Sequence, residues 1–405
     1  MDQLYNMENK MSENYLFTSE SVTEGHPDKV CDMISDAILD AVLLQDPDSR
    51  VACETMITTA KVIVSAEITT KAKVNYKEIV TKTLKFIGYT MKDLGVLEKD
   101  DSFILTLMKE QSPHIAQGVN ATDNHEQGAG DQGLMFGYAC KETPELMPLP
   151  ITLAHRLTEK LTDVRKNGTL NWLKPDGKSQ VTIEYDKYNM PKKVKKVVIA
   201  TQHIDMLDKF EDEKKEYEFI KKNIIEEVIM PVLDSYSLDC DKDFIVNGTG
   251  RFVEGGPQAD VGLTGRKIIV DTYGGYAKHG GGAFSGKDPS KVDRSAAYMA
   301  RYISKNIVAA NLAERCEVQL AYCIGVAEPM SVNINTYNTG SISDHEIVNL
   351  IKRCFDLKPA SIISKLKLKR PIYNKFASYG HFGREEDCTW ECLDMVEKIK
   401  QNLKG

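Results

Sequence analysis

The sequence contains no long apolar run and no pair of cysteines with C-x-x-C spacing. A transmembrane helix needs about 18 or more consecutive apolar residues, so we expect no membrane-spanning segment. The first residues, MDQLYNMENKMSENY, lack the apolar core of a signal peptide and predict a polar N-terminal extension over residues 1–14. The nine cysteines form no C-x-x-C pair, which suits reduced thiols in the cytoplasm better than zinc binding or a disulfide framework.

The chain also lacks an excess of positive charge. Its 52 lysines and arginines are outnumbered by 59 aspartates and glutamates, and the net charge of −7 argues against general nucleic-acid binding. Any anion site must therefore be a local group of cations. With 42% hydrophobic and 27% charged residues and a mean hydropathy of −0.34, the composition is globular, and 405 residues suggest two to four domains.

The apolar pattern repeats a helix, a strand hairpin and a second helix three times. The expected helices span residues 27–45, 75–87, 151–166, 211–230, 289–313 and 344–354, and the expected strands span residues 51–57, 61–68, 179–185, 194–203, 317–325 and 330–337. This pattern predicts an α+β fold of three similar domains in a pseudo-threefold arrangement, each a mostly antiparallel sheet with helices on one face. The other face of each sheet then requires cover from another domain or a second subunit.

The expected domains cover residues 15–114, 134–254 and 255–405. Between the first two lie residues 115–133, a glycine-rich stretch that ends in GAGDQG at Gly128–Gly133. A long irregular segment within a compact protein is usually functional, and we expect a mobile loop at the active site here. A surface Ω-loop without function is the alternative.

The stretch GGGAFSGKDPSKVDRSAAY, at Gly280–Tyr298, suggests an anion site. Its glycines allow the backbone to approach a ligand, while Asp288 as the N-cap and Pro289 at the first helical position predict a helix. A glycine-rich loop that opens a helix binds anions, and the nearby cations favour a polyphosphate; these are Lys287, Lys291 and Arg294. The stretch is not a standard P-loop, because Asp288 replaces the required serine or threonine. A capped turn without a ligand is the alternative.

Three carboxylates are candidate magnesium ligands, because each flanks a glycine-rich or helix-start segment. They are Asp28, Asp131 and Asp293. Asp28 follows His26 at the start of the first helix, where it could instead simply complement the helix dipole. Lys291 and Asp293 would diverge by about 200° on a regular helix, so both serve one site only if it lies at the first turn.

A second glycine-rich patch spans Gly250–Lys267. Arg266 and Lys267 end it and precede an expected strand over residues 268–272. Phe252 within it could stack on a base or pack in the core. Pro175–Lys178 has the composition of a turn. Two carboxylates, Glu54 and Glu67, lie in the first hairpin, where each points either to solvent or toward a cation or an amino group.

Together these segments resemble the S-adenosylmethionine synthetase family, the methionine adenosyltransferases, from about residue 17 to residue 384. The resemblance is carried by EGHPDK at Glu24–Lys29, GAGDQG at Gly128–Gly133, GGAFSGKDPSKVD at Gly281–Asp293 and GHFGR at Gly380–Arg384. It implies that the sulfur of L-methionine attacks C5′ of ATP to give S-adenosylmethionine, and that the departing triphosphate is hydrolysed to pyrophosphate and phosphate. It also implies a homodimer or dimer of dimers with active sites at the subunit interface.

The resemblance further implies roles for individual residues. The implied catalytic residues are His26, Lys178, Lys287, Lys291 and Arg266, with His26 acting on the departing oxygen. The implied ATP contacts are His26, Asp176, Lys178, Arg251, Phe252, Asp260, Arg266, Lys267, Ala283 and Lys287. The implied methionine contacts are Glu67, Gln111, Asp260 and Lys291. The implied metal ions are Mg²⁺, two per site, held by Asp28 and Asp293, and K⁺, held with the help of Glu54; Asp131 lies near the site.

Two residues depart from the family pattern. His114 stands where the family usually has aspartate, and Gly248 stands where many members have proline; neither change removes an implied catalytic group. Two other functions stay open. A different ATP-dependent phosphotransferase would produce ADP or AMP, and a catalytically silent ATP-binding regulatory subunit would lack catalytic groups.

Overall fold

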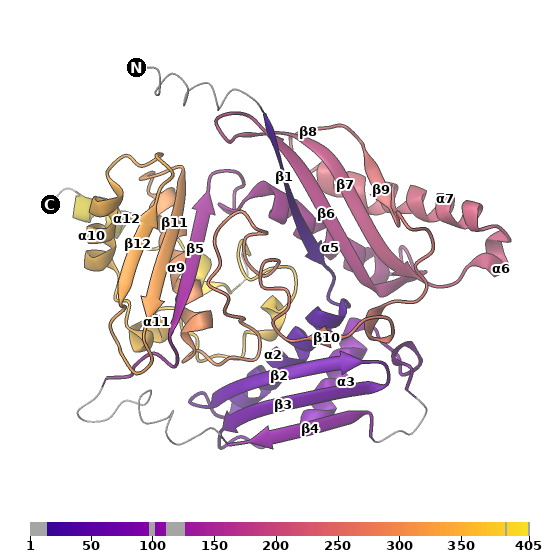
Figure 1. Cartoon of the computed structure of the whole chain (residues 1–405), viewed down its shortest axis with the longest axis horizontal. Coiled ribbons are helices and arrows are strands. Elements are labelled where there is room, and N and C mark those ends of the chain that lie inside the picture. The colour runs from indigo at the N-terminus through magenta and orange to yellow at the C-terminus, as the bar shows by residue number, and fades with distance from the viewer. Residues whose placement is uncertain (1–13, 97–101, 111–125, 385–386, 404–405) are drawn as a thin grey trace, which may run out of the picture.

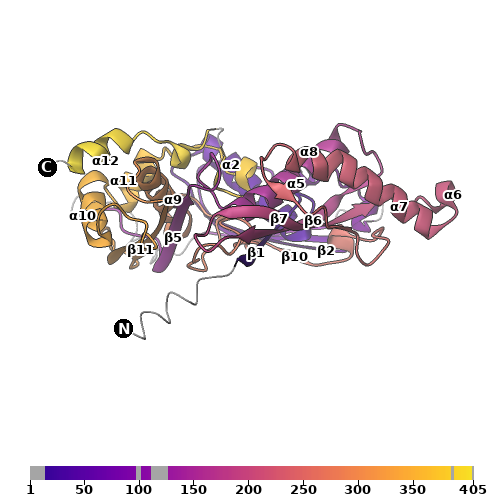
Figure 2. The same ribbon diagram turned by 90° about the horizontal axis from the view of Figure 1, so that it is seen from above.

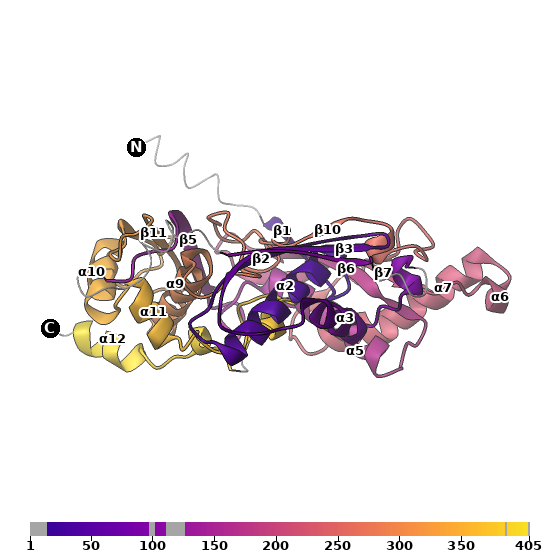
Figure 3. The same cartoon turned by 90° about the horizontal axis from the view of Figure 1, so that it is seen from below.

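The computed structural model describes residues 14–96, 102–110, 126–384 and 387–403. Three sheets occupy three lobes of an elongated molecule (Figure 1). Seen from above and from below, the strands lie toward one broad side and most helices toward the other (Figure 2, Figure 3). The α+β architecture that the sequence predicts is confirmed.

The first sheet lies in the lower lobe of Figure 1. Its strands, in spatial order, are β10 (Gly262–Leu263), β2 (Arg50–Thr58), β3 (Lys61–Thr69) and β4 (Ile104–Lys109). The expected hairpin is antiparallel, whereas β4 runs parallel to β3. Its helices are α2 (Pro27–Gln45) and α3 (Tyr76–Ile87). Alternate residues of β2 and β3 are buried, because successive side chains of a strand point to opposite faces.

The second sheet has a long antiparallel hairpin at its centre. Its strands are β1 (Tyr15–Val22), β6 (Leu173–Tyr185), β7 (Pro191–His203), β8 (Asp239–Cys240) and β9 (Phe244–Val246). The helices of this lobe are α5 (Leu149–Lys166), α6 (Leu207–Phe210), α7 (Glu213–Ile224) and α8 (Met230–Leu233). A π-helical turn, η3 (Ile225–Ile229), interrupts the single helix expected over residues 211–230.

The third sheet has the order β12 (Ser331–Asn335), β11 (Arg315–Tyr322) and β5 (Gly133–Cys140). Its helices are α9 (Val292–Ala309), α10 (Asp344–Cys354), α11 (Pro359–Lys365) and α12 (Val396–Leu403). Short 3₁₀ turns complete the described chain: η2 (Lys92–Leu94), η4 (Gly256–Gln258), η5 (Asn374–Phe376) and η6 (Thr389–Glu391). All nine cysteines are free, and no described helix has both the length and the apolar character needed to cross a bilayer.

The three sheets exchange strands along the chain. β1 precedes the first hairpin yet pairs with β6, from Tyr15 opposite Tyr185 to Val22 opposite Lys178. Likewise β5 precedes the second hairpin but pairs with β11, and β10 follows it but pairs with β2. Each of these three strands therefore pairs with a strand from a distant part of the sequence, and these pairings join neighbouring lobes.

Two local predictions are wrong. α9 begins at Val292 rather than at Pro289, because the Asp288 carboxylate accepts hydrogen bonds from the N–H groups of Val51 and Ser290 instead of capping the helix. Residues 268–272 form a turn rather than a strand: the N–H of Asp271 donates to the carbonyl of Lys267, and the turn places Asp271 against the buried Lys29.

A buried ion pair joins α9 to the C-terminal part of the chain. Arg301 Nε and Nη2 each donate to a carboxylate oxygen of Glu391 at 2.9 Å, and Lys305 donates to the same carboxylate at 2.7 Å. The remaining guanidinium donors reach the main-chain carbonyls of Tyr138, Glu145 and Leu146. A buried charge is tolerated when it is paired and hydrogen-bonded in this way, and removing one partner is strongly destabilising.

Arg301→Met removes the guanidinium and leaves the Glu391 carboxylate with less compensation. We expect the free energy of unfolding to fall by about 3–5 kcal/mol. The control is Arg156→Met, because Arg156 pairs with Glu159 on an exposed surface, where the expected loss is below about 1 kcal/mol. Urea unfolding midpoints measure both effects, and equal shifts in the two variants would contradict the importance of the buried pair.

Candidate active site

Two glycine-rich segments lie along the outer edge of β2, the edge that does not pair with β3. The first segment spans residues 262–267 and the second spans residues 280–293. The backbone partners are Gly262 with Ile57, Leu263 with Met56 and Thr264 with Thr55 near one end of β2, and Gly286 with Cys53 and Asp288 with Val51 near the other. Each segment thereby continues the sheet for a few residues. Because hydrogen bonds to one strand fix both segments, β2 sets the spacing between the cations that follow them.

The approach of these segments requires glycine at two positions. Gly286 has φ +78°, and a Cβ there would lie 1.9 Å from the carbonyl oxygen of Cys53. Gly265 also has φ +78°, and its Cβ would lie 2.6 Å from the Cβ of Ala283. The second contact shows that the two segments touch each other as well as β2, which brings Ala283 beside the turn that carries Arg266.

Lysines and carboxylates alternate along the second segment. The Lys287 ammonium lies 2.6 Å from a carboxylate oxygen of Asp293, and the Lys291 ammonium pairs with Asp288. Lys291 is the N-cap of α9 and has an extended backbone, so the divergence expected between two residues of a regular helix does not apply to Lys291 and Asp293. The segment therefore presents two lysines beside one glycine-rich turn.

Arg294 does not join these lysines, contrary to the expectation from the sequence. It is fully buried, and its guanidinium forms two hydrogen bonds to the carboxylate of Asp36, at 2.8 and 2.6 Å. A bidentate ion pair of this kind holds α9 against α2 and leaves the guanidinium unavailable to a ligand.

The turn at His26 packs against the start of β6. A Cβ on Gly25 would lie 2.3 Å from Pro175, and Thr23 Oγ1 donates to the carbonyl of Pro175 at 2.7 Å. The N–H of Thr23 also donates to the carbonyl of Gly177 at 2.9 Å. These contacts place His26 and Asp28 next to the part of β6 that carries Asp176 and Lys178.

His26 is a buried, neutral imidazole. Burial, together with the positive charges of Lys267 and Lys178, lowers the pKa of His26 to about 3. Its Nδ1 accepts a hydrogen bond from the N–H of Asp28 at 3.2 Å. In a neutral imidazole the other nitrogen then carries the proton, so Nε2–H is a hydrogen-bond donor.

Asp28 is an ionised carboxylate despite its burial. Burial alone would raise the pKa of Asp28, but the Lys267 ammonium and the N–H of Leu263 hold it below its usual range. The carboxylate therefore links the start of α2 to the segment on the β2 edge. Lys267 and His26 meet at this carboxylate.

Asp176 lies beside this group with one oxygen unsatisfied. Its Oδ2 accepts from the N–H of Gly256 at 2.9 Å, while Oδ1 is buried and has no hydrogen-bond partner within the described chain. Burial raises the pKa of Asp176 to about 6, and the charge of Asp260 acts in the same direction. Phe252 precedes Gly256 by four residues, and its N–H donates to His203 Nε2 at 3.0 Å.

Some expected site residues are not brought to this group within one chain. The Arg251 guanidinium is bound by Glu216 and Asp205. Glu54 and Glu67 are exposed on the outer face of the first sheet, the face turned away from α2 and α3. Gln111 and His114 lie outside the described residues, as do residues 1–13 of the N-terminal extension.

Within the described chain, no group of three or more histidine, cysteine, aspartate or glutamate side chains could hold a metal ion by itself. Magnesium bound to a nucleotide needs only one or two protein carboxylates, with phosphate and water as its other ligands. Asp28 and Asp293 fit that requirement. Gly282 leaves room beside Asp293, because a Cβ there would lie 2.3 Å from its Oδ1.

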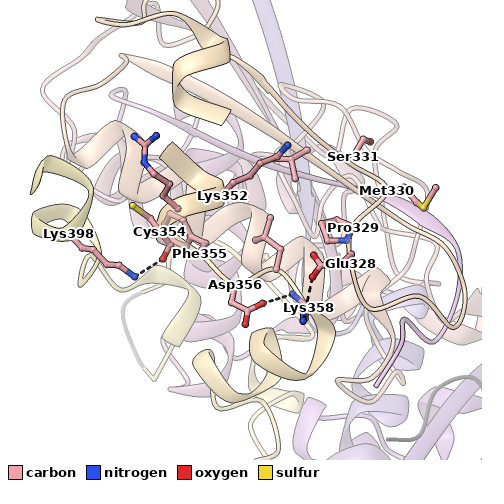
Figure 4. A pocket seen from close by; sticks show the side chains of 13 residues that line it. Glu328, Pro329, Met330, Ser331, Lys352, Cys354, Phe355, Asp356, Lys358 and Lys398 are labelled. Atoms are coloured by element: carbon pink, nitrogen blue, oxygen red, sulfur yellow. Dashed lines mark hydrogen bonds and ion pairs between the residues drawn. The ribbon is translucent and has the colours of Figure 1, made fainter. Parts of the chain in front are cut away.

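A large cavity lies elsewhere, in the third lobe. Its volume is about 700 Å³, and Figure 4 shows Lys352, Phe355 and Lys358 among the side chains that line it. None of the described residues implied in the active site belongs to its lining. This large cavity is therefore not the candidate active site, whose residues lie on the β2 edge.

Sequence reasoning missed two residues that shape the glycine-rich segments. His279 Nδ1 accepts from the N–H of Gly281 at 2.8 Å, which fixes the start of the glycine run. Thr264 Oγ1 accepts from the N–H of Thr55 at 2.9 Å and lies 2.9 Å from the hydroxyl of Ser35. Their place in the sequence could have indicated both residues. His279 directly precedes the glycine run at Gly280, and Thr264 directly precedes Gly265.

The fold and the site define a class of protein: a three-domain α+β chain whose cations, carboxylates and glycine backbone gather at a shared sheet edge. Models of the N-terminal, central and C-terminal domains of S-adenosylmethionine synthetase match residues 14–113, 126–252 and 254–392. The chain therefore belongs to the S-adenosylmethionine synthetase family and is an enzyme, a methionine adenosyltransferase.

Two relatives are similar over nearly their whole length. The S-adenosylmethionine synthase of Desulfosudis oleivorans is 55% identical over 393 residues, which cover 96% of this chain and 99% of the relative. The S-adenosylmethionine synthase of Syntrophobacter fumaroxidans is 54% identical over 391 residues, which cover 96% of this chain and 98% of the relative.

Asp176→Asn tests the buried carboxyl by its pH dependence. The folded pKa of about 6 lies above the unfolded value of about 3.9, so the native state binds the proton more tightly and the wild type loses stability as pH rises through this window. The stability of Asp176→Asn relative to the wild type should rise between pH 4 and pH 6 and level off above about pH 7. Urea midpoints of both proteins measure this difference; a difference independent of pH would show that the carboxyl is not perturbed.

Proposed function

We propose that this chain makes S-adenosylmethionine by direct attack of the L-methionine sulfur on C5′ of ATP, followed by hydrolysis of the released triphosphate to pyrophosphate and phosphate. The observation that carries the proposal is the pairing of two cation-bearing, glycine-rich segments with one edge of β2. A triphosphate leaving group needs positive charge and backbone N–H groups spaced over several phosphates. The β2 edge fixes both in advance of substrate binding.

The chemistry requires no nucleophilic side chain. A thioether has no proton to lose, so no general base is needed, and the barrier is lowered by alignment and by stabilisation of the leaving group. Lys178 and Arg266 suit the second task because, within the described chain, neither forms an ion pair with a carboxylate. The Nε2–H of His26 is an uncharged hydrogen-bond donor, which can stabilise the negative charge that develops on the departing oxygen.

The lysines of the second segment would serve both substrates. Lys287 would bind the triphosphate, and Lys291 would bind L-methionine together with Asp260. Glu67 and Gln111 complete the proposed methionine contacts. Lys287 and Lys291 are both paired with carboxylates of the chain, so substrate binding would exchange these partners for anionic oxygens.

Divalent metal ions fit the same arrangement. Asp28 and Asp293 would hold Mg²⁺, two ions per site, and Glu54 would help to hold K⁺. Bound Mg²⁺ would neutralise charge on the triphosphate. The chain's own contribution is to hold each carboxylate beside a lysine, as Lys267 does for Asp28 and Lys287 does for Asp293.

The proposed partner is a second copy of the chain, as a homodimer or a dimer of dimers. The outer face of the first sheet carries Leu105 and Leu107, which are 45% and 48% exposed, next to Ile63 and Met56 on the same face. Glu54 and Glu67 lie on that face too. A second copy over this surface would bury its apolar part and enclose the two carboxylates in a shared site.

Product analysis with ATP, L-methionine, Mg²⁺ and K⁺ tests the proposal. We expect a sulfonium product that depends on methionine, together with equimolar pyrophosphate and phosphate. ADP or AMP with a phosphorylated product would instead identify a phosphotransferase. A folded protein that turns over neither substrate would be a silent ATP-binding subunit.

Lys287→Ala tests the proposed electrostatic role. We expect kcat to fall by about 10²–10³, the usual effect of removing one fixed group that stabilises developing charge. Stability should change by less than about 1 kcal/mol, because Lys287 is only partly buried. Lys141→Ala, in the exposed pair with Glu314, is the control and should keep full activity. Unchanged turnover in folded Lys287→Ala would remove Lys287 from the mechanism.

Leu105→Asp tests the proposed interface. A charge buried in an apolar contact is costly, so this variant should shift the protein to a monomer in light scattering and lower its activity by at least about tenfold. Leu44→Asp is the control, since Leu44 is 71% exposed on α2, on the helical side of the first sheet. A dimeric, fully active Leu105→Asp variant would refute this placement of the interface.

A further inference from the structure

A second cavity, of about 440 Å³, is lined by residues of α11 and its neighbours. Figure 1 labels α11 in the third lobe. The cavity is lined by Gln127, Ala360, Ile363, Ser364, Lys367, Lys369 and Arg370. None of these residues belongs to the active site described above. Four of them recur at the i, i+3, i+4 and i+7 spacing of one helix face, which runs from α11 into the turn that follows it.

Among the residues that the structure describes, the lining contains cations and hydrogen-bond donors but no carboxylate. Three residues, Lys367, Lys369 and Arg370, carry positive charge, and Ser364 adds a hydroxyl. Of the lysines, Lys369 pairs with Asp48 on the exposed surface. The positive charge of Lys367 and Arg370 is matched by no ion pair within the described chain.

Two donors in this lining lack acceptors. Gln127 Nε2 and Arg370 Nη2 are both buried and have no hydrogen-bond partner within the described chain. A buried donor without an acceptor destabilises the protein that carries it, so such groups call for an explanation. An anion with several acceptor oxygens in the cavity would satisfy both.

The local backbone holds these donors in place. Lys367 follows α11 in the left-handed conformation, with φ +49°, where glycine is usually favoured. Its carbonyl accepts a hydrogen bond from Arg370 Nε at 2.8 Å. That bond occupies one edge of the guanidinium and leaves Nη2 for another acceptor.

The larger cavity of Figure 4 differs in charge. Glu328 and Asp356 line it, and Lys358 is paired with the carboxylates of Glu328 and Glu126. Lys398 donates to the carbonyl of Cys354 at 2.8 Å. Lys358 and Lys398 thus already have acceptors, and none of the described residues in this lining carries a buried donor without a partner, unlike the cavity beside α11.

We propose that the cavity beside α11 binds a phosphate group. A phosphate dianion offers acceptor oxygens to the amide of Gln127, the guanidinium of Arg370 and the ammonium of Lys367 at once. Two sources share this chemistry: free inorganic phosphate, and a phosphomonoester whose apolar part would contact Ala360 and Ile363. A volume of about 440 Å³ exceeds what one phosphate fills and accommodates either.

Calorimetric titration of the full-length protein tests the proposal, with inorganic phosphate and adenosine 5′-monophosphate as probes. Ionic strength is held constant with chloride and no Mg²⁺ is added. Arg370→Gln should weaken phosphate binding at least about tenfold, as expected for loss of a charge-assisted hydrogen bond. Lys367→Gln carries the same expectation at an exposed residue, so the test does not depend on Arg370→Gln folding. Lys352→Ala, in the other cavity, is the control and should bind as the wild type does.

Gln127→Leu separates a ligand-binding role from a structural one. It removes an unsatisfied buried donor, so the ligand-free melting temperature should stay the same or rise while phosphate affinity falls. Tighter binding of adenosine 5′-monophosphate than of phosphate would identify a phosphomonoester site, and equal binding a free-anion site. Absence of binding, binding unaffected by the Arg370, Lys367 and Gln127 substitutions, or a lower melting temperature of Gln127→Leu would overturn the proposal.

Discussion

The arrangement of the site depends on the outer edge of β2. An open strand edge presents unpaired N–H and C=O groups, and here segments distant in sequence fill it: Thr264 meets Thr55 across 209 residues. Hydrogen bonds to successive residues of one strand have fixed spacing, so the separation between Lys267 and Lys287 is set by the sheet. Fixed charges of this kind need no reorganisation when a charged group develops between them, which is the condition for efficient electrostatic catalysis.

A buried ion cluster locks this edge to the start of α2. Lys29 donates to Asp32 at 2.9 Å and to Asp271, and Asp32 accepts from the N–H of Gly265 at 2.8 Å. Burial would lower the pKa of Lys29, but Asp271 and Asp32 raise it, so the ammonium stays charged. Loss of Lys29 would leave two carboxylates buried together, a costly arrangement. The turn of His26 and the turn of Arg266 are therefore positioned by one cluster.

Much of this was readable from the sequence, because local rules govern it. α10 begins and ends as predicted over residues 344–354, since Ser343 and Glu346 form a capping box and the apolar period is regular. What failed depended on partners far along the chain. Asp288 has the sequence of an N-cap but bonds to Val51, and Arg294 looks like a ligand cation but is buried against Asp36. No local pattern reveals that β1 crosses to β6, or that the turn at Gly25 packs on Pro175.

The alternation that builds each sheet also explains why assembly would matter for the chemistry. One face of β2 and β3 is buried under helices, so Glu54 and Glu67 fall on the same open face as Met56 and Ile63. In a single chain these carboxylates are solvated, and water weakens every interaction they make. Cover by a second copy would lower the local dielectric and strengthen each charge contact severalfold. A reaction driven by placed charge rather than by a nucleophilic side chain would gain from such enclosure at every charged group at once.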